Sequence, residues 1–468
     1  MAKYRLTTTY KKLLADTITP VSIYLKVRDK FANSILLESS DYHSNENSFS
    51  YICCNPLAKF EVSNGNIITE FPDRSSKSEK ITDRAQVLNE LESFKSSFET
   101  EKSPFNFNNN GLFGYMAYDS VRYFEDLEIK TFESEDRKIP EILYHVYQYV
   151  IVINHFKNEL FIFEHCYDDQ CKGLDQVESL LINKNFASYK FFPCDDEISN
   201  FTDTEFLDVI KKGIDHCYRG DVFQIVLSRR FSQSYTGDEF NVYRALRSVN
   251  PSPYLFYFDY GSFKIFGSSP EAQIVIKNGK ASIYPIAGTF KRTGNDDQDA
   301  ELARKLFDDP KENSEHVMLV DLARNDLSRS GKEVSVETFK EIQYYSHVIH
   351  LVSKVTGVLE GDKSSLSLVA DTFPAGTLSG APKHMAMNLI NRFENGNRGY
   401  YGGCIGLLSF NGDFNHAIMI RSFLSKNNHL YYQAGAGVVA KSELQSELNE
   451  VHNKLLALRT AIKLAKEI

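Results

Sequence analysis

Tryptophan is absent from this 468-residue sequence, although it contains 34 phenylalanines and 26 tyrosines. Also missing is any apolar run near the roughly 18 residues of a membrane span, so we expect no helical membrane protein. The N-terminus has no apolar core or cleavage site, so we expect no signal peptide. Basic residues are not in excess, because 53 Lys and Arg stand against 62 Asp and Glu, for a net charge of −9. This balance disfavours a nucleic-acid partner.

Cysteine is scarce as well. The seven cysteines are Cys53, Cys54, Cys166, Cys171, Cys194, Cys217 and Cys404. They form neither the paired CxxC spacing of zinc sites nor an even set typical of secreted disulfide proteins. The sequence therefore predicts a reduced, cytoplasmic protein. Hydrophobic residues make up 42% and charged residues 25%, which indicates a globular chain of about three domains or two large ones.

We expect two regions, an N-terminal domain over residues 1–195 and a catalytic domain over residues 196–468, joined at the polar run Asp195–Asn200. Two stretches rich in β-branched and aromatic residues, Tyr144–Asn154 and Leu160–Glu164, predict a β-hairpin. The stretch Asp73–Lys80, rich in serine and lysine, is interpreted as a solvated loop.

The second region opens with a helix signal. Thr202–Glu205 has the Thr-x-x-Glu form of a capping box, and Asp309-Pro310 predicts the start of another helix. Ser442 and Gln445 are expected to cap a last helix that runs to the C-terminus. Short β-rich stretches lie between these helices. Together they predict an α+β protein with much antiparallel sheet.

Two of these helices carry glutamates beside apolar residues. At about 100° per residue, Glu315 falls within the apolar stripe formed by Met318–Leu322, and Glu312 lies nearby. Glu447 and Glu450 border the stripe of the last helix. Two such pairs could converge on one Mg²⁺, which prefers oxygen ligands. Alternatively, Glu312 completes a capping box and the later pair is solvated.

Glycines gather late in the sequence, between residues 376 and 437. They let backbone N–H groups approach an anion closely, but none follows a nucleotide-binding pattern, and hairpin turns are the simpler explanation. Arg421 follows the apolar run Ala417–Ile420. Its guanidinium could clamp a carboxylate, or it could simply lie at the surface.

Long motifs in the second region closely resemble the chorismate-utilising enzymes. They are PIAGT (Pro285–Thr289), EHVMLVDLARNDL (Glu315–Leu327), HVIHLVSKVTG (His347–Gly357), FPAGTLSGAPK (Phe373–Lys383), YYGGCIG (Tyr400–Gly406) and QAGAGVV (Gln433–Val439). The N-terminal region matches mainly through LLESS (Leu36–Ser40). The resemblance implies an α+β fold of two interleaved, antiparallel-sheet-rich domains, with helices packed outside and the active site in their cleft.

The resemblance also implies roles for individual residues. Glu271 resembles the general acid that protonates the departing ring hydroxyl, His350 an acid–base group near the ring, and Thr377 a pocket-wall residue. The positions that resemble the holders of the substrate carboxylates are Gly288, Thr289, Tyr401, Arg421, Gly435, Ala436 and Gly437.

The metal positions follow from the same resemblance. Glu315 and Glu450 match the principal Mg²⁺ positions, and Glu312 and Glu447 match assisting ones. This favours the metal interpretation of the two glutamate pairs. It also gives Glu315 the partners that its apolar surroundings lack.

Two positions distinguish branches of the family. Gln224 stands where isochorismate and salicylate synthases carry a lysine base, and Ala287 where aminodeoxychorismate synthases commonly carry a nucleophilic lysine. Without either amine, ammonia itself is the expected nucleophile, as in the large aminase subunit of anthranilate synthases. The alternatives are an aminodeoxychorismate synthase that lacks the lysine and a non-catalytic tryptophan-sensing subunit. Lys441, where Asp is common, leaves details of the last helix's start open.

The branch implies two partners besides chorismate. No Cys-His-Glu glutaminase set is evident, so a separate glutamine amidotransferase subunit is expected to supply ammonia. The second partner is L-tryptophan as an inhibitor. The residues that resemble the family's inhibitor pocket are Glu38, Ser39 and Ser40 together with Pro253, Tyr254 and Leu255. Leu255 stands where Met is common. The absence of tryptophan from the chain agrees with an enzyme that must be made when this amino acid is scarce.

Overall fold

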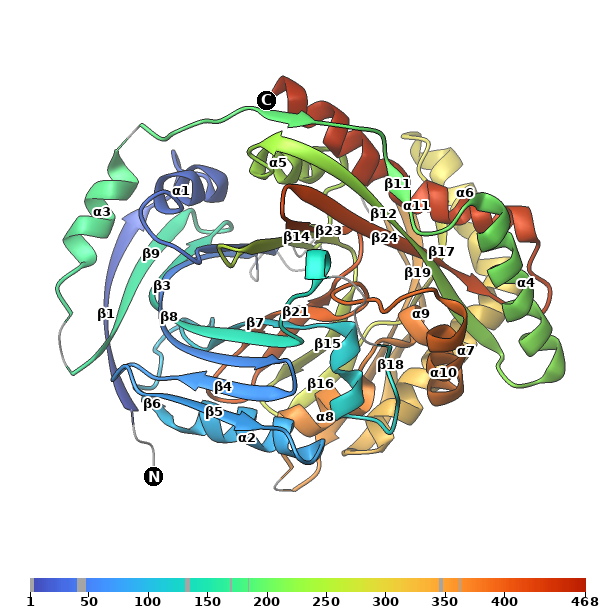
Figure 1. Ribbon diagram of the computed structural model, residues 1–468, viewed down its shortest axis with the longest axis horizontal. Coiled ribbons are helices and arrows are strands. Elements are labelled where there is room, and N and C mark those ends of the chain that lie inside the picture. The colour runs from blue at the N-terminus through green and yellow to red at the C-terminus, as the bar shows by residue number, and fades with distance from the viewer. Residues whose placement is uncertain are drawn as a thin grey trace.

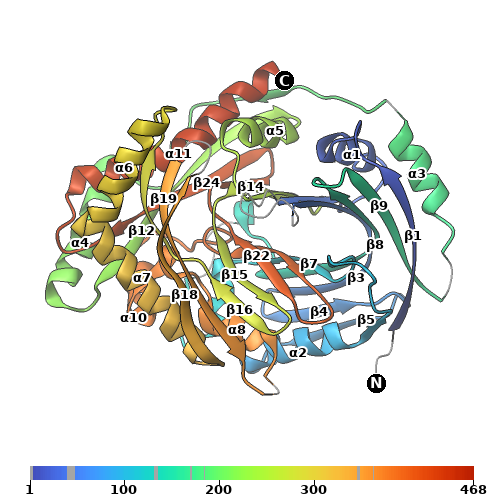
Figure 2. The same cartoon turned by 180° about the vertical axis from the view of Figure 1, so that it is seen from behind.

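The structure is a computed structural model in which β-sheets form the centre and helices surround them (Figure 1, Figure 2). It describes residues 4–39, 48–130, 135–168, 171–183, 185–344, 348–361 and 363–468. The predicted α+β class, rich in antiparallel sheet, is confirmed; among the strand pairs of the described residues, only β1 with β6 is parallel.

One run of paired strands crosses both predicted regions. Its order is β6 (Phe98–Thr100), β1 (Tyr4–Leu14), β9 (Glu159–Tyr167), β8 (Ile142–Asn154), β3 (Phe49–Ser63), β2 (Ile35–Ser39), β13 (Tyr254–Asp259), β14 (Phe263–Ser269), β23 (Ser422–Lys426), β24 (His429–Val438) and β12 (Gln224–Gly237). Three short strands also pair with β12, namely β10 (Phe191–Pro193), β11 (Ile198–Ser199) and β20 (Gly380–Ala381).

A second run leaves from the same two central strands. Its order is β5 (Ser76–Lys80), β4 (Asn66–Glu70), β3, β8, β7 (Leu112–Met116), β21 (Cys404–Leu408), β22 (Phe414–Ile418), β15 (Ala272–Lys277), β16 (Lys280–Ile283) and β19 (Val348–Leu359). β19 also pairs with β17 (Ile286–Lys291) and β18 (Gly331–Tyr344).

The long strands β3 and β8 belong to both runs. One half of β3 pairs with β2 and the other half with β4, while β8 pairs with β9 at its end and with β7 at its start. The pairs β2–β13 and β7–β21 each join a strand before residue 195 to one after it. The strands of the two predicted regions are therefore interleaved.

Helices cover the sheets from outside (Figure 1, Figure 2). They are α1 (Pro20–Val27), α2 (Ala85–Ser96), α3 (Leu174–Ile182), α4 (Asp203–Arg219), α5 (Phe240–Val249), α6 (Asp296–Asp308), α7 (Pro310–Ser328), α8 (Ser365–Thr372), α9 (Gly376–Ser379), α10 (Lys383–Phe393) and α11 (Leu444–Leu464). The largest core includes the region where α4 packs against β12, α11 against β24, and α5 against α11 and β14. None of the described helices is both long and apolar enough to cross a membrane.

Several local predictions are confirmed. The hairpin is β8 with β9. The capping box at the start of α4 is present, because Thr202 accepts from the Glu205 N–H and Glu205 accepts from the Thr202 N–H. At the start of α7, the Glu312 N–H donates to Asp309 Oδ1 over 3.0 Å.

Two local predictions are wrong. Residues 76–80 are not loop but the exposed edge strand β5, which pairs with β4 through its backbone, so its polar composition concealed it. Ser442 does not cap the last helix. The N-cap of α11 is Glu443, without a side-chain cap, and Ser442 Oγ instead accepts from the Val439 N–H at 3.0 Å.

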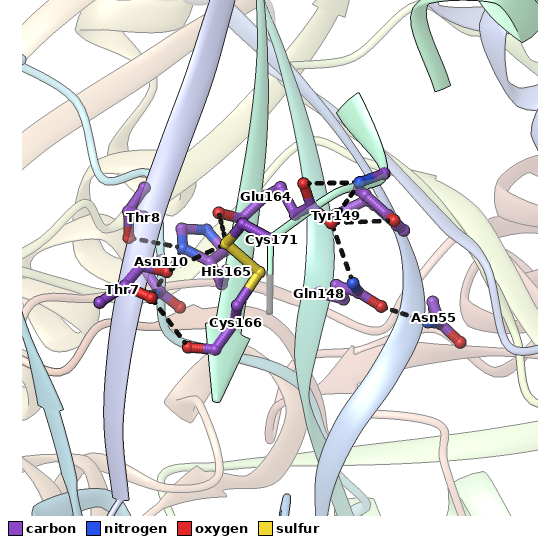
Figure 3. The surroundings of a disulfide bond; sticks show 11 residues. Thr7, Thr8, Asn55, Asn110, Gln148, Tyr149, Glu164, His165, Cys166 and Cys171 are labelled. Carbon is purple, nitrogen blue, oxygen red and sulfur yellow. Dashed lines mark hydrogen bonds between the residues drawn. A yellow bond between two sulfur atoms is a disulfide. The ribbon is translucent and has the colours of Figure 1, made fainter. Parts of the chain in front are cut away.

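The cysteines differ from prediction at one place, shown in Figure 3, where a disulfide joins Cys166 of β9 to Cys171. Glu164 of the same strand accepts from the Gly173 N–H at 2.9 Å, so bond and carboxylate together tie β9 to the start of α3. The prediction of fully reduced cysteines is wrong for this pair, because only the fold shows that the chain doubles back after β9. The other five cysteines carry free thiols.

Candidate active site

Glu271 lies in the turn between β14 and β15, on the wall of a cavity. Thr377 of α9 donates a hydrogen bond to Glu271 Oε1 over 3.0 Å. Burial raises the pKa of Glu271 to about 7, against the opposing effects of the Thr377 hydrogen bond and of the Lys454 and Arg421 charges. A substantial fraction of this carboxyl is therefore protonated near neutral pH, as a general acid requires.

Arg421 and His350 lie within electrostatic reach of each other, and Arg421 within reach of Glu271. Arg421 sits between β22 and β23 with a positive φ of 47°, so the chain turns there rather than continuing a strand. Burial lowers the pKa of Arg421, while Glu271 opposes this effect. Among the described residues, none is hydrogen-bonded to its guanidinium, which leaves its fork open to a carboxylate.

His350 of β19 is held by the neighbouring strand. Its Nδ1 donates to the Gly288 carbonyl over 3.0 Å, because a carbonyl can only accept. Burial lowers the pKa of His350, and Arg421 lowers it further, so the imidazole is neutral at pH 7. A neutral imidazole can take up a proton.

Gly288 forms a bulge in β17 opposite β19, with a φ of +69° that favours glycine. A Cβ at this position would lie 3.0 Å from Glu312 Oε2, so the bulge makes room for that carboxylate. The backbone of Thr289 is in register with His350. The Thr289 side chain lies outside the described part of the chain.

Gln224 opens β12 and contacts the first predicted metal ligand. Its Nε2 donates to Glu315 Oε1 over 2.9 Å. The other amide atom, Oε1, is buried and has no hydrogen-bond partner among the described residues. A Cβ on Gly437 would lie 2.5 Å from Gln224 Nε2 and 3.8 Å from Glu315 Oε1, so β24 runs close beside both.

Glu315 is placed differently from the sequence pattern. The buried residues of α7 are His316, Leu319, Val320, Ala323, Asp326 and Leu327. Glu315 therefore stands at the border of the buried face of α7, not in its middle, and is only half-buried.

The carboxylates of α11 approach β24 from the other side. Glu447 is buried, and Glu450 is half-buried and paired with Lys454 at 2.7 Å. Lys454 also donates to the Gly435 carbonyl over 2.8 Å. Burial raises the pKa of Tyr401, against the opposing effect of the Gly435 backbone. Ala436 is fully buried and belongs to the largest core.

The donor chemistry of the four glutamates fits a hard divalent cation, since they offer only carboxylate oxygens. Two lie on α11, which packs against β24, and two on α7, whose Glu315 comes close to Gly437 of that strand. Their oxygens are not gathered into a group of three within 4.8 Å. Within the described ranges, that spacing occurs only for Glu164, Cys166 and Cys171.

The predicted inhibitor residues lie where β2 meets β13. Ser39 is in register with Tyr254, and Glu38 with Leu255. The Glu38 carboxylate accepts from Tyr243 Oη at 2.7 Å and from Arg247 Nε at 2.9 Å. Ser40 lies outside the described residues.

One cavity of about 1420 Å³ reaches from the predicted inhibitor residues to Glu271, which alone of the predicted active-site residues within the described ranges lines it. Ser39, Pro253 and Tyr254 line it, and so does Glu271. A ligand at the β2–β13 end would therefore share a hollow with the predicted general acid.

Lys454 was missed by the sequence analysis. It lies one helical turn after Glu450, and its charge acts on Glu271. The i, i+4 Glu–Lys spacing was the available signal, but such pairs are common on solvent-exposed helices.

The chain is similar to known proteins over nearly its whole length. The family described as chorismate binding enzyme matches residues 33–460. Anthranilate synthase component 1 of Aquifex aeolicus is 37% identical over 99% of this chain and 96% of its own. The crystal structure of anthranilate synthase component I from Streptococcus pneumoniae is 31% identical and superposes with a TM-score of 0.77, over 96% of this chain and 99% of its own.

A more distant structure shares the fold. The menaquinone-specific isochorismate synthase of Escherichia coli has a TM-score of 0.74 at 16% identity, over 98% of this chain and 95% of its own. At this identity the likeness extends to the fold alone.

Proposed function

The chain belongs to the chorismate-binding enzyme family and, within it, to the anthranilate synthase component 1 group; on this premise we propose that it converts chorismate and ammonia to anthranilate, pyruvate and water. The observation that carries the proposal is that Glu271 and Arg421 lie close enough to act on each other's pKa. Burial raises the pKa of Glu271 to about 7, and no described residue is hydrogen-bonded to the Arg421 guanidinium. This arrangement suits a substrate that carries a carboxylate and loses a hydroxyl.

Glu271 acts in the first half of the reaction. Ammonia forms a bond to ring carbon 2, the ring electrons shift, and the bond from carbon 4 to its hydroxyl breaks. Glu271 supplies the proton with which that hydroxyl leaves as water. Thr377 orients the carboxyl through its hydrogen bond to Oε1.

Gln224 sets the nucleophile. Its amide is neutral and cannot act as the base that would activate water, and its Oε1 is an acceptor available to an N–H of ammonia. Ala287 provides no amine either. Since neither residue supplies an amine, as a base or as a nucleophile, ammonia is the proposed nucleophile.

His350 acts in the second half, when pyruvate leaves and the ring becomes aromatic. A proton must move away from ring carbon 2 as the bond from carbon 3 to the enolpyruvyl oxygen breaks. The neutral imidazole beside Arg421 suits that transfer.

The substrate carboxylates are held by Arg421, by Tyr401 and by backbone groups. The backbone groups belong to Gly288, Thr289, Gly435, Ala436 and Gly437. Mg²⁺ is the proposed cofactor, with Glu315 and Glu450 as its main ligands and Glu312 and Glu447 in support. When bound, it would orient the ring carboxylate and offset its charge.

A separate glutamine amidotransferase subunit is the proposed source of ammonia. Burial raises the pKa of the thiols of Cys53, Cys54 and Cys404, which opposes the thiolate that a glutaminase needs. Among the described residues, no cysteine is hydrogen-bonded to a histidine. A cytoplasmic location belongs to the same proposal.

We also propose L-tryptophan as a feedback inhibitor bound where β2 meets β13. The Ser39 hydroxyl and the strand backbone would hold its ammonium and carboxylate, and Pro253 and Leu255 would border the indole. Since the Glu38 side chain is already paired with Arg247, its contribution is to the frame of the pocket. The shared cavity supports a coupling of this ligand to chorismate binding.

The test is product analysis of the purified chain. With chorismate, Mg²⁺ and ammonium at raised pH, it should form fluorescent anthranilate, and with glutamine in place of ammonium it should form none. Aminodeoxychorismate as the product would indicate the folate-branch alternative. Glutamine-dependent anthranilate formation by the chain alone would refute the separate ammonia source, and no turnover with any ammonia donor would refute the function.

A further inference from the structure

Glu394 and Arg398 form an ion pair that none of the proposed roles above uses. Glu394 follows α10, and Arg398 comes one helical turn's length later, at an i, i+4 spacing. The guanidinium donates through Nε to Oε2 at 3.0 Å and through Nη2 to Oε1 at 2.6 Å. Glu394 and Arg398 are only 4% and 3% exposed, so the fork is fixed within the protein.

The two terminal nitrogens of Arg398, Nη1 and Nη2, also donate to carbonyls of two elements of the candidate active site. Nη1 donates to the Leu378 carbonyl over 2.5 Å, directly after Thr377, which supports Glu271. Nη2 donates to the Val226 carbonyl over 2.7 Å, and Val226 is in register with Gly437. One guanidinium thereby fixes α9 relative to β12.

Glu394 binds the same strand two residues further on. Its Oε1 accepts from the Ser228 N–H at 2.9 Å and from Ser228 Oγ at 2.7 Å. Ser228 is in register with Gly435 of β24, and Ser228 Oγ in turn accepts from Gln433 Nε2 at 2.7 Å. The carboxylate therefore holds the section of β12 on which Gly435 and Gly437 are paired.

The guanidinium also packs against Tyr401. Its central carbon lies 5.8 Å from the centre of the Tyr401 ring and 4.8 Å from that of Tyr118. These are cation–π distances, at which a desolvated cation attracts an aromatic ring. The pair therefore contacts the Tyr401 ring directly and, through Ser228 of β12, holds the strand position that is in register with Gly435.

We propose that Glu394 and Arg398 are a positioning pair that sets the substrate-binding geometry. It rests on the proposed function, because Tyr401, Gly435 and Gly437 are the groups proposed to hold the chorismate carboxylates. The hydrogen bonds of the pair end on α9 and on β12, and the guanidinium packs on the Tyr401 ring. A small displacement of reacting or binding groups costs much in an enzyme. Neither side chain is proposed to touch chorismate.

The test compares Arg398→Lys and Glu394→Gln with Arg28→Lys. Arg28 forms a comparable two-point pair with Asp238, at 3.1 and 2.7 Å and with side chains 10% and 11% exposed, and neither residue has a proposed role in binding or catalysis. Lysine keeps the charge of arginine but loses the planar fork. For each variant we would measure the melting temperature, KM and kcat with ammonium, and chorismate binding by calorimetry.

For Arg398→Lys we expect KM and the chorismate dissociation constant to rise at least about tenfold, with a smaller loss of kcat. Glu394→Gln should change them in the same direction. Arg28→Lys should lower the melting temperature similarly but leave KM within about twofold. Ser228→Ala is a milder change that removes the two hydrogen bonds of the hydroxyl, to Glu394 and from Gln433, and keeps the one from the Ser228 N–H to Glu394. It covers the case in which the ion-pair variants do not fold, and should raise KM about threefold.

The possible failures are distinct. If the wild-type chain forms no anthranilate, the proposed function is wrong, while chorismate binding still measures the effect of the pair. If the wild type is active and the folded variants lose stability like Arg28→Lys yet keep wild-type KM and chorismate binding, the pair serves the fold alone and the positioning role is overturned. The positioning role is overturned as well if only Ser228→Ala folds and it keeps the wild-type KM.

Discussion

Glu38 and Glu271 are two carboxylates withdrawn from bulk water near the same cavity, and the chain surrounds them differently. Glu38 is 6% exposed and receives hydrogen bonds from Tyr243 and from both Nε and Nη2 of Arg247. Glu271 receives one side-chain hydrogen bond, from Thr377, and its pKa rises to about 7.

The difference indicates a structural role for Glu38 and a chemical role for Glu271. A carboxylate held by two hydrogen bonds from one guanidinium fixes its neighbours in place. A carboxylate buried with little support can exchange a proton near neutral pH, which is what the proposed chemistry requires. The region where β2 meets β13 is thus built to keep its shape, and the region around Glu271 is built to react.

The largest expected effect is at the predicted metal position. Glu315→Gln keeps the size of the side chain but removes its charge, so turnover should fall by roughly three orders of magnitude with little change in melting temperature. Asp321→Asn, at an exposed position of the same helix, is the matched control and should retain activity. Full activity of the Glu315 variant, or wild-type activity in excess EDTA, would contradict the metal assignment.

Removing the proposed acid should have the next largest effect. Glu271→Gln should lower kcat by about 10² to 10⁴. In the wild type, with free ammonia held constant, kcat/KM should decline as pH rises through about 7, because the acid must be protonated. The Gln variant should lack this decline.

A second variant sharpens the same point. The Thr377 hydrogen bond lowers the pKa of Glu271, so Thr377→Val should raise that pKa and move the decline to higher pH. A decline that stays in place, or that persists in Glu271→Gln, would assign the acid to another group.

Ser39→Phe tests the predicted inhibitor site where β2 meets β13. The larger side chain should fill the pocket and abolish tryptophan inhibition, while activity without tryptophan stays within about twofold, since Glu271 is left intact. Ser39→Ala leaves the space open and serves as the control. Calorimetry that detects no tryptophan binding to the wild type, or equal inhibition of the Phe variant, would remove the site from consideration.

The smallest expected effect is at Gln224. A lysine there provides a base that the amide lacks, so Gln224→Lys should yield a trace of isochorismate by addition of water. Liquid chromatography of the products would detect it. A folded variant that binds chorismate and forms none would show that residue 224 does not by itself select the nucleophile.

Local structure was predictable where local interactions decide it. The capping box at Thr202 and the β8–β9 hairpin follow from nearby residues. The strand β5 and the Cys166–Cys171 bond were not predictable, since an edge strand of polar residues forms only on the sheet that it joins, and the disulfide depends on a turn of the chain.

The candidate site shows the same limit. Motif resemblance located Glu271, Arg421 and Gln224, but not that Gln224 contacts Glu315 or that Lys454 reaches the backbone of Gly435. Glu394 and Arg398 carried no signal beyond an i, i+4 charge pair. Their significance comes from carbonyls of β12 and α9, which are far away in sequence.

The pairing of β7 with β21 has a consequence for synthesis on the ribosome. β7 pairs with β8 soon after it emerges, but its other edge waits for β21, which is translated almost at the end of the chain. Contacts between such distant segments make folding slow, and an unpaired edge meanwhile can capture a strand of another copy. A nascent or truncated chain that ends before β21 therefore exposes an edge of β7 that is paired in the full-length protein. We expect chaperone supply and the rate of translation to govern how much active protein a cell obtains.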